Sequence, residues 1–124
     1  MDNLNKITEI IIDAGLVVHK TLGPGLLEKV YHECLIHELR LRDLNVKSEL
    51  SVPIKYKNNE FDAGFRLDLL VENSIIVEIK AVVDFNPVFK SQVLTYLRLM
   101  HLKIGLLLNF NVPLFKNGIY RLIN

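Results

Sequence analysis

The chain has 124 residues, half of them hydrophobic, and a formal net charge of +1. This length allows one domain, residues 1–124, and the apolar content is ample for a packed core and excludes disorder. No apolar run is long enough to span a bilayer and no signal peptide precedes the first helix, so a cytoplasmic protein that does not bind membranes is expected. The single cysteine, Cys34, agrees with that compartment.

The small net charge limits how the chain could bind nucleic acid. Dedicated DNA-binding domains usually carry a strong basic excess, because phosphate contacts supply most of their affinity. A chain of charge +1 would bind nucleic acid weakly or transiently. Otherwise a partner protein or a second copy in a homo-oligomer would supply most of the affinity for nucleic acid.

Two helices are expected at the start of the chain. Apolar residues recur at helical spacing from Asn3 to Thr21, and the corner Leu22–Gly25 ends that helix because Pro24 cannot continue the hydrogen-bond ladder. The corner lacks the Lys-Ser/Thr of a phosphate loop. A second helix is predicted from Leu26 to Arg42. One stripe along this helix contains Gly25, Glu28, Tyr31 and His32. If the stripe faces the sheet, Gly25 is expected to allow a close contact between the helix and the sheet.

Two residues of these helices are candidates for function. Glu28 lies near a helix N-terminus, where an acid also has a structural explanation in the helix macrodipole. His19 follows the inward-facing Val17 and Val18, and a lone histidine in such a place is more often a packing residue than a ligand. The histidines show no zinc-like spacing.

Three antiparallel strands are expected next. The segment Val46–Lys57 alternates apolar and polar residues, and Pro53 favours an edge position for it. Asn58-Asn59 is a hairpin signal. Two shorter strands follow, Phe65–Val71 and Ile75–Lys80, joined by the turn formers Glu72, Asn73 and Ser74.

The turn between the two shorter strands sets the register of two acids. A loop of Glu72, Asn73 and Ser74 pairs Val71 with Ile75 and therefore Asp68 with Glu78. Directly opposed Cβ atoms lie roughly 4.5–5.5 Å apart, so both carboxylates could hold one hard cation. Lys80 shares the face of Glu78, because residues two apart in a strand point the same way.

A charged Glu-x-Lys pair often lies on a solvated strand edge, but the neighbours here are apolar. The run is IIVEIKAVV, the pattern of a strand covered on both faces. Burying a carboxylate beside a lysine is costly unless the groups are paired or bind a metal. The pattern therefore favours a functional site over a solvated edge.

The last third of the chain predicts a helix and further strands. Asn86-Pro87 can cap a helix that runs to Met100 and carries Gln92 and Tyr96 on one face. The apolar run Ile104–Phe110 suits an interior strand of a mixed sheet. A terminal hairpin is predicted between Leu114-Phe115 and Ile119–Ile123, across Asn117-Gly118.

Several of these motifs together resemble one protein family. The spacing D-x9-E-x-K of Asp68, Glu78 and Lys80 resembles the signature of the PD-(D/E)XK nuclease superfamily. The spacing G-x-x-E-x-x-Y resembles that of the GxxExxY protein family, a branch of the superfamily, and further matches are VHKTLGPG, QVLTYLR and GLLLNF. The resemblance covers nearly the whole chain and implies an α/β, restriction-endonuclease-like core. Its mixed β-sheet is flanked by helices in the order ααβββαβ, followed by the C-terminal β-hairpin.

The resemblance also implies a function. It implies a Mg²⁺-dependent nuclease, with Mn²⁺ as a substitute, that hydrolyses phosphodiester bonds, with DNA as the expected substrate and RNA as the alternative. Asp68, Glu78 and the Ile79 carbonyl would bind the metal, and Lys80 and Glu28 would complete the catalytic group. The residues expected to support the site are Gln92, Tyr96, Tyr31 and His19.

A different class of function is also consistent with the sequence. The chain could be a non-catalytic interaction or nucleic-acid-associated domain that retains the nuclease fold. The near-neutral charge favours this alternative, whereas the presence of all four charged positions argues against it.

Overall fold

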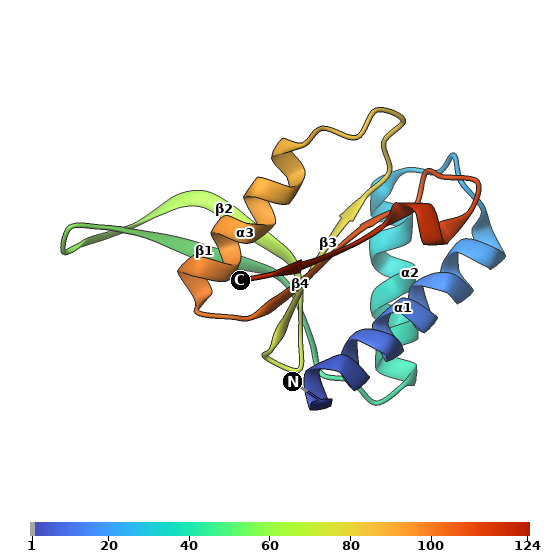
Figure 1. Ribbon diagram of the computed structural model, residues 1–124, viewed down its shortest axis with the longest axis horizontal. Coiled ribbons are helices and arrows are strands. Elements are labelled where there is room, and N and C mark those ends of the chain that lie inside the picture. Colours follow the sequence, from blue (N-terminus) through green and yellow to red (C-terminus); the bar gives the residue numbers. More distant parts are fainter. Residues whose placement is uncertain (1) are drawn as a thin grey trace.

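A computed structural model describes residues 2–124 (Figure 1). The elements in chain order are α1 (Asp2–Leu22), α2 (Glu28–Leu41), β1 (Val46–Tyr56), β2 (Asn59–Val71), β3 (Ile75–Lys80), α3 (Val88–Met100), β4 (Ile104–Asn109), the 3-10 helix η1 (Phe115–Gly118) and β5 (Ile119–Ile123). Within residues 2–124, no helix combines the length and the apolar character that crossing a membrane requires.

The strands form one five-stranded sheet in the order β1-β2-β3-β4-β5. The first three strands are an antiparallel meander, β4 lies parallel to β3, and β5 is antiparallel to β4. Helix α3 makes the crossover between the two parallel strands, as a parallel connection requires. The predicted α/β fold, a mixed sheet flanked by helices, is therefore confirmed.

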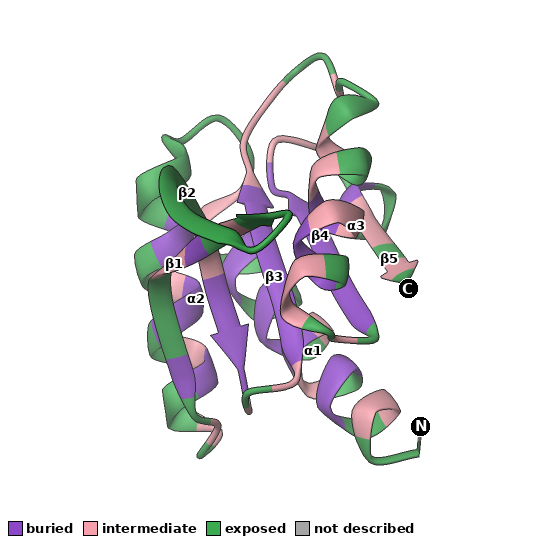
Figure 2. Cartoon of the chain, turned by 90° about the vertical axis from the view of Figure 1, so that its left-hand side faces the viewer, coloured by how far each residue is buried: buried purple, intermediate pink, exposed green. Residues whose placement is uncertain are grey.

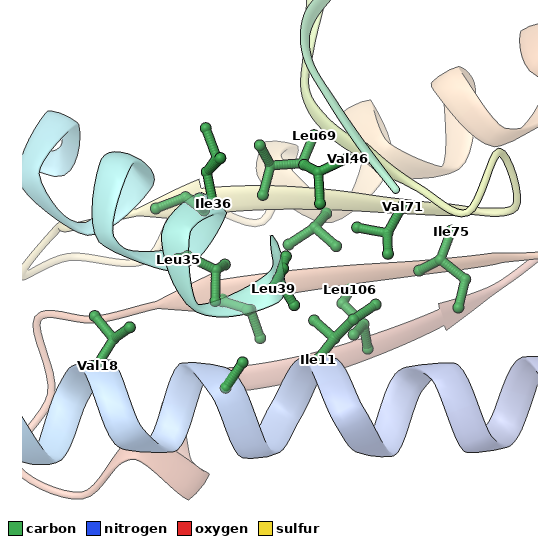
Figure 3. Close-up of a cluster of buried hydrophobic side chains, with 14 of the residues drawn as sticks. Ile11, Val18, Leu35, Ile36, Leu39, Val46, Leu69, Val71, Ile75 and Leu106 are labelled. Atoms are coloured by element: carbon green, nitrogen blue, oxygen red, sulfur yellow. The ribbon is translucent and has the colours of Figure 1, made fainter. Parts of the chain in front are cut away.

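Helices cover both faces of the sheet. On one face, α1 and α2 pack Ile11, Leu35 and Leu39 against the strand residues Leu69 and Ile75 (Figure 3). On the other face, α3 packs against a second apolar cluster formed by Val93, Leu97, Ile76 and Leu107. Strands β3 and β4 lie between these layers and are buried almost throughout (Figure 2). A charged side chain in β3 is thus a costly feature of the core.

The outer half of the β1–β2 hairpin projects beyond the helices (Figure 1). We call residues 53–66 the arm. Residues Asn59–Arg66 are exposed (Figure 2), and β2 begins six positions before the predicted start at Phe65. The prediction that Pro53 marks an edge strand is confirmed, since β1 lies at one edge of the sheet.

The predicted C-terminal hairpin is wrong in its pairing. Phe115 begins the 3-10 helix η1 and is buried, with its ring centroid 5.0 Å from that of Phe110 and 5.4 Å from that of His19. Strand β5 pairs with β4 instead of with Leu114-Phe115. Burying a phenylalanine side chain is worth about 1.5–3 kcal/mol, whereas an isolated hairpin is only marginally stable.

The end of η1 contacts the backbone of β4 and yields a first testable prediction. A Cβ atom on Gly118 would lie 2.0 Å from the Asn109 carbonyl oxygen. Gly118→Ala must shift one of the two segments, and we expect a loss of about 1–3 kcal/mol of folding free energy. Thermal unfolding measures this loss. Asn117→Ala, at the exposed neighbouring position, is the control, and equal melting temperatures for the two variants would show that the contact relaxes freely.

Candidate active site

The register of β2 and β3 is the predicted one, and it sets the two acids opposite each other. Val71 pairs with Ile75 and the backbone pairing runs on to Leu69 and Val77, where it stops. The next two residues in register are Asp68 and Glu78.

Beyond this point the carboxylates replace the backbone bonds of the ladder. The Asp68 N–H donates to Glu78 Oε1 at 3.1 Å, and the Ile79 N–H donates to Asp68 Oδ2 at 2.8 Å. Each acid is therefore held by the backbone of the opposite strand, which brings both carboxylates to one place.

Strand β2 is distorted at Asp68. Residues two apart in a regular strand share a face, yet Leu67 packs in the α3 cluster and Leu69 in the α1/α2 cluster. On β1, Glu49 has a left-handed backbone with φ 52°, and the β1–β2 pairing omits Glu49 and Asp68. The distortion frees Asp68 from both neighbouring ladders, so its carboxylate can turn toward β3.

Glu78 is buried, with an exposed fraction of 5%. Burial, followed by the negative charge of Asp68, raises the pKa of Glu78 to about 9, while Lys80 opposes the shift. Two carboxylates in such a place cannot both be ionised cheaply without a compensating charge. The pair is therefore a site that holds either a proton or a cation at neutral pH.

Lys80 and Glu28 lie near the paired acids, Lys80 within electrostatic reach of Glu78 and Glu28 within electrostatic reach of Asp68. The Lys80 Nζ lies 4.5 Å from the centroid of the Phe89 ring. The Lys80 backbone carbonyl accepts a hydrogen bond from the Phe110 N–H at 2.9 Å. Glu28 is the first residue of α2. Partial burial raises the pKa of Glu28, Lys80 opposes that shift and Asp68 adds to it, so Glu28 lies within electrostatic reach of both residues.

Gln92 and Tyr96 approach the acids from α3. Tyr96 is buried, and this burial, together with the charge of Glu78, raises the pKa of Tyr96, whereas a hydrogen bond with Gln92 lowers it. The predicted shared face of Gln92 and Tyr96 thus points toward Glu78.

Tyr31 and His19 support the fold at a distance from the carboxylates. The Tyr31 hydroxyl donates to the Gly23 carbonyl at 2.6 Å and accepts from the Leu26 N–H at 3.1 Å. His19 Nε2 lies 2.7 Å from the Val112 carbonyl oxygen. These contacts fix the α1–α2 corner and the chain after β4. Within residues 2–124, neither side chain forms a hydrogen bond with Asp68 or Glu78.

The prediction that Gly25 makes a close contact between a helix and the sheet is wrong. Gly25 precedes α2 and is exposed, and no heavy atom of the described chain lies within 4 Å of the place where its Cβ would be. Its φ of +98° is the reason for a glycine here, because other residues rarely adopt this conformation.

The corner before α2 gives a second prediction. Tyr31→Phe keeps the ring that stacks on Phe110 but leaves the Gly23 carbonyl and the Leu26 N–H without the hydroxyl. We expect a loss of about 1–3 kcal/mol of folding free energy, seen in thermal or denaturant unfolding. Tyr56→Phe, on the exposed arm, should change little. A Tyr31→Phe variant as stable as Tyr56→Phe would show that water replaces the hydroxyl at no cost.

Sequence reasoning did not assign roles to three residues beside the acids. His32 is buried, and its Nε2 lies 3.3 Å from the Asp68 carbonyl oxygen. Asn109, also buried, bonds Val82 through its amide oxygen (3.1 Å) and its amide nitrogen (3.0 Å), which anchors the chain just after Lys80. The third is Phe89, under the Lys80 ammonium. The available signals were a histidine one turn after Glu28 and a polar residue ending the run GLLLN.

The donor atoms at this place are the kind that hard divalent cations prefer. Asp68 and Glu78 supply carboxylate oxygens, and each carboxylate accepts a hydrogen bond from the backbone of the opposite strand. Within residues 2–124, no three His, Cys, Asp or Glu side chains gather into a metal cluster, and the carboxylates that the structure pairs here are those of Asp68 and Glu78. Their burial and mutual repulsion fit a cation between them.

The profile of the PD-(D/E)XK nuclease superfamily matches residues 5–122. The chain belongs to the PD-(D/E)XK nuclease superfamily. No curated protein and no solved structure matched the chain in the corresponding searches. Membership implies interaction with nucleic acid, and PD-(D/E)XK nucleases generally use divalent metals. In this PD-(D/E)XK protein the paired acids and the following lysine lie at the edge where β2 and β3 separate.

Proposed function

We propose that the chain is a metal-dependent phosphodiesterase of the GxxExxY branch, acting on DNA in preference to RNA, with Mg²⁺ as its cofactor and Mn²⁺ as a substitute. The observation that carries the proposal is the pair of buried, cross-bonded carboxylates of Asp68 and Glu78, followed by Lys80. The preference for DNA rests on the family resemblance.

Each residue of the site has a separate task in this proposal. Asp68, Glu78 and the Ile79 carbonyl would hold the metal, which when bound would polarise the scissile phosphate and lower the pKa of a water molecule. Lys80 stabilises the negative charge that develops on the phosphate, because an ammonium in a water-poor site acts more strongly than in bulk water. Glu28 completes the acidic group.

The remaining residues of the proposed site keep these groups in position. Tyr96 lies within electrostatic reach of Glu78, and Gln92 holds Tyr96 through a hydrogen bond. His32 holds the Asp68 backbone, and Asn109 holds the chain after Lys80. The proposal therefore includes four residues of α2 and α3 that the D…ExK strands alone would not supply, namely Glu28, His32, Gln92 and Tyr96.

The geometry of the G-x-x-E-x-x-Y residues supports the assignment to the GxxExxY branch. Gly25 allows the left-handed turn, and Tyr31 reaches back to bond the corner on both sides of it. Between them, Glu28 begins α2 within electrostatic reach of Asp68. The spacing thus explains how an acid from a helix is fixed next to the strands.

A cleavage assay tests the proposal. The purified chain is incubated with single-stranded, duplex and branched DNA and with RNA, in Mg²⁺, in Mn²⁺ and in a chelator. We expect cleavage with either metal, faster on DNA than on RNA, no cleavage in the chelator, and none by Glu78→Ala. Equal cleavage by Glu78→Ala would place the activity elsewhere. No cleavage of any substrate in either metal would favour the non-catalytic alternative.

A further inference from the structure

A groove runs along α3 beside the proposed site. It has a volume of about 540 Å³, and its walls include Ile54, Phe65, Lys80, Phe89, Gln92 and Tyr96. Binding sites for small organic groups typically measure about 300–1,000 Å³, so the groove can take a nucleobase with part of its sugar. Because Lys80 forms part of the wall, a group held here lies next to the proposed catalytic residues.

Aromatic side chains continue from this groove along the arm. Phe65 has an exposed fraction of 43%, and its ring meets that of Tyr96 edge to face, with the centroids 6.3 Å apart. Phe61 pairs with Ile54, and Tyr56 lies two residues from Ile54, so both share the face of Ile54 that lines the groove.

These two arm residues are strongly exposed, Phe61 at 51% and Tyr56 at 62%. Exposed aromatic side chains of the arm therefore lie on the same face of the hairpin as the groove that Lys80 lines. Exposed aromatic side chains beside a pocket are typical of a binding site.

The charges that line the groove suit an anion. Among the described residues that line the groove, Lys80 is a cation and none is a carboxylate. On the arm, the Lys57 Nζ lies 5.5 Å from the centroid of the Tyr56 ring. The whole chain, however, has a charge of only +1, which is too little to hold a duplex through its phosphates alone. Stacking of bases on aromatic rings supplies affinity that does not depend on net charge.

We propose that this groove and the arm bind unpaired bases of a single-stranded nucleic acid segment, with the bases stacked on Phe65 and its aromatic neighbours and the backbone directed to Lys80. This inference rests on the proposed function and names its substrate class. Bases inside a duplex are already paired and stacked, so they would reach these rings only after being flipped out. Single-stranded or branched nucleic acid is therefore the substrate, and continuous duplex is not.

Binding without cleavage tests the proposal. Fluorescence anisotropy in chelator compares a labelled single-stranded DNA oligonucleotide with the duplex of the same sequence, using the full chain. We expect tighter binding of the single strand, and a 2-aminopurine base in it should lose fluorescence on binding because it stacks. Phe65→Ala and Phe61→Ala should each weaken single-strand binding by roughly 5- to 100-fold, the range typical of one lost stacking contact. Leu114→Ala, at an exposed apolar position on another surface, should bind like the wild type.

Three results would overturn the proposal. The first is that the duplex binds as tightly as the single strand. The second is that Phe65→Ala and Leu114→Ala change single-strand binding equally. The third is self-association in sedimentation that Phe65→Ala abolishes, since a second copy would then cover the groove. Because the binding assay contains no metal, its result is separate from catalysis. Stacking-dependent binding without any cleavage in metal would support this inference and contradict the proposed function.

Discussion

Asp68→Asn, Glu78→Gln and Lys80→Met should each reduce the rate of nucleic acid cleavage by roughly 10²–10³-fold or more while the fold is kept. Asp68→Asn and Glu78→Gln remove negative charge from the proposed metal site, and Lys80→Met removes the ammonium that faces the developing phosphate charge. Lys80→Arg should also be poor. Its planar guanidinium cannot replace a compact ammonium that packs over the Phe89 ring.

The measurement is a single-turnover rate at saturating metal, with circular dichroism and thermal unfolding for each variant. Glu9→Gln is the matched control, because Glu9 is an exposed acid of α1. It should cleave at the wild-type rate. Undiminished cleavage by all three site variants would end the assignment of the activity to this site, whatever the behaviour of the control.

The position of the acids could be predicted because two independent local signals agreed. Alternating residues fixed the faces of β3, and the turn of Glu72, Asn73 and Ser74 fixed the register that the structure shows from Val71–Ile75 onward. Gln92 and Tyr96 followed from the helical period of α3. Each of these inferences depends on residues that are close in sequence.

The distortion of β2 at Asp68 could not be predicted from the sequence. Alternation places Leu67 and Leu69 on one face, yet they belong to different clusters. The cause lies partly in the neighbouring strand, where Glu49 has a left-handed backbone. No pattern within β2 reveals a bend that is shared with β1, and without that bend the hydrogen bond from the Ile79 N–H to the Asp68 carboxylate would not be expected.

The errors at the two loops have a common physical reason. Asn117-Gly118 is a strong hairpin signal, but burial of Phe115 and the close approach of Gly118 to the Asn109 carbonyl decide the local structure. Gly25 fits a helix stripe by spacing, but its positive φ places it in the turn before the helix. In both cases tertiary packing or backbone conformation overrides a sequence spacing.

The stability of the metal-free protein should fall as the pH rises, and Glu78 should be the main cause. The pKa of Glu78 is raised from 4.5 to about 9 by burial and by Asp68, so the folded state holds this proton more tightly than the unfolded chain does. The resulting stabilisation is complete below pH 4.5 and is lost as the pH rises toward 9. At about 1.4 kcal/mol for each pH unit, the loss between pH 5 and pH 8 is up to about 4 kcal/mol.

Glu78→Gln isolates this contribution, because glutamine keeps an acceptor for the Asp68 N–H but does not ionise. Denaturant unfolding at pH 5 and pH 8, in chelator, should show that the variant loses far less stability than the wild type and is the more stable protein at pH 8. Glu9→Gln, at an exposed position of α1, should keep the wild-type pH dependence. At pH 8, Mg²⁺ at a hundredfold excess over its dissociation constant should stabilise the wild type by about 2.7 kcal/mol, and Glu78→Gln much less.

The opposite result has an equally definite meaning. If Glu78 were instead the structural ion partner of Lys80, Glu78→Gln would leave a partly buried ammonium unpaired and cost on the order of 3–5 kcal/mol at pH 8. The wild-type and variant pH profiles would then run parallel, and added Mg²⁺ would change neither. That combination would make the Asp68, Glu78 and Lys80 cluster a structural feature of the β2–β3 edge and favour a non-catalytic domain, because a site kept for a cation must be less stable without it.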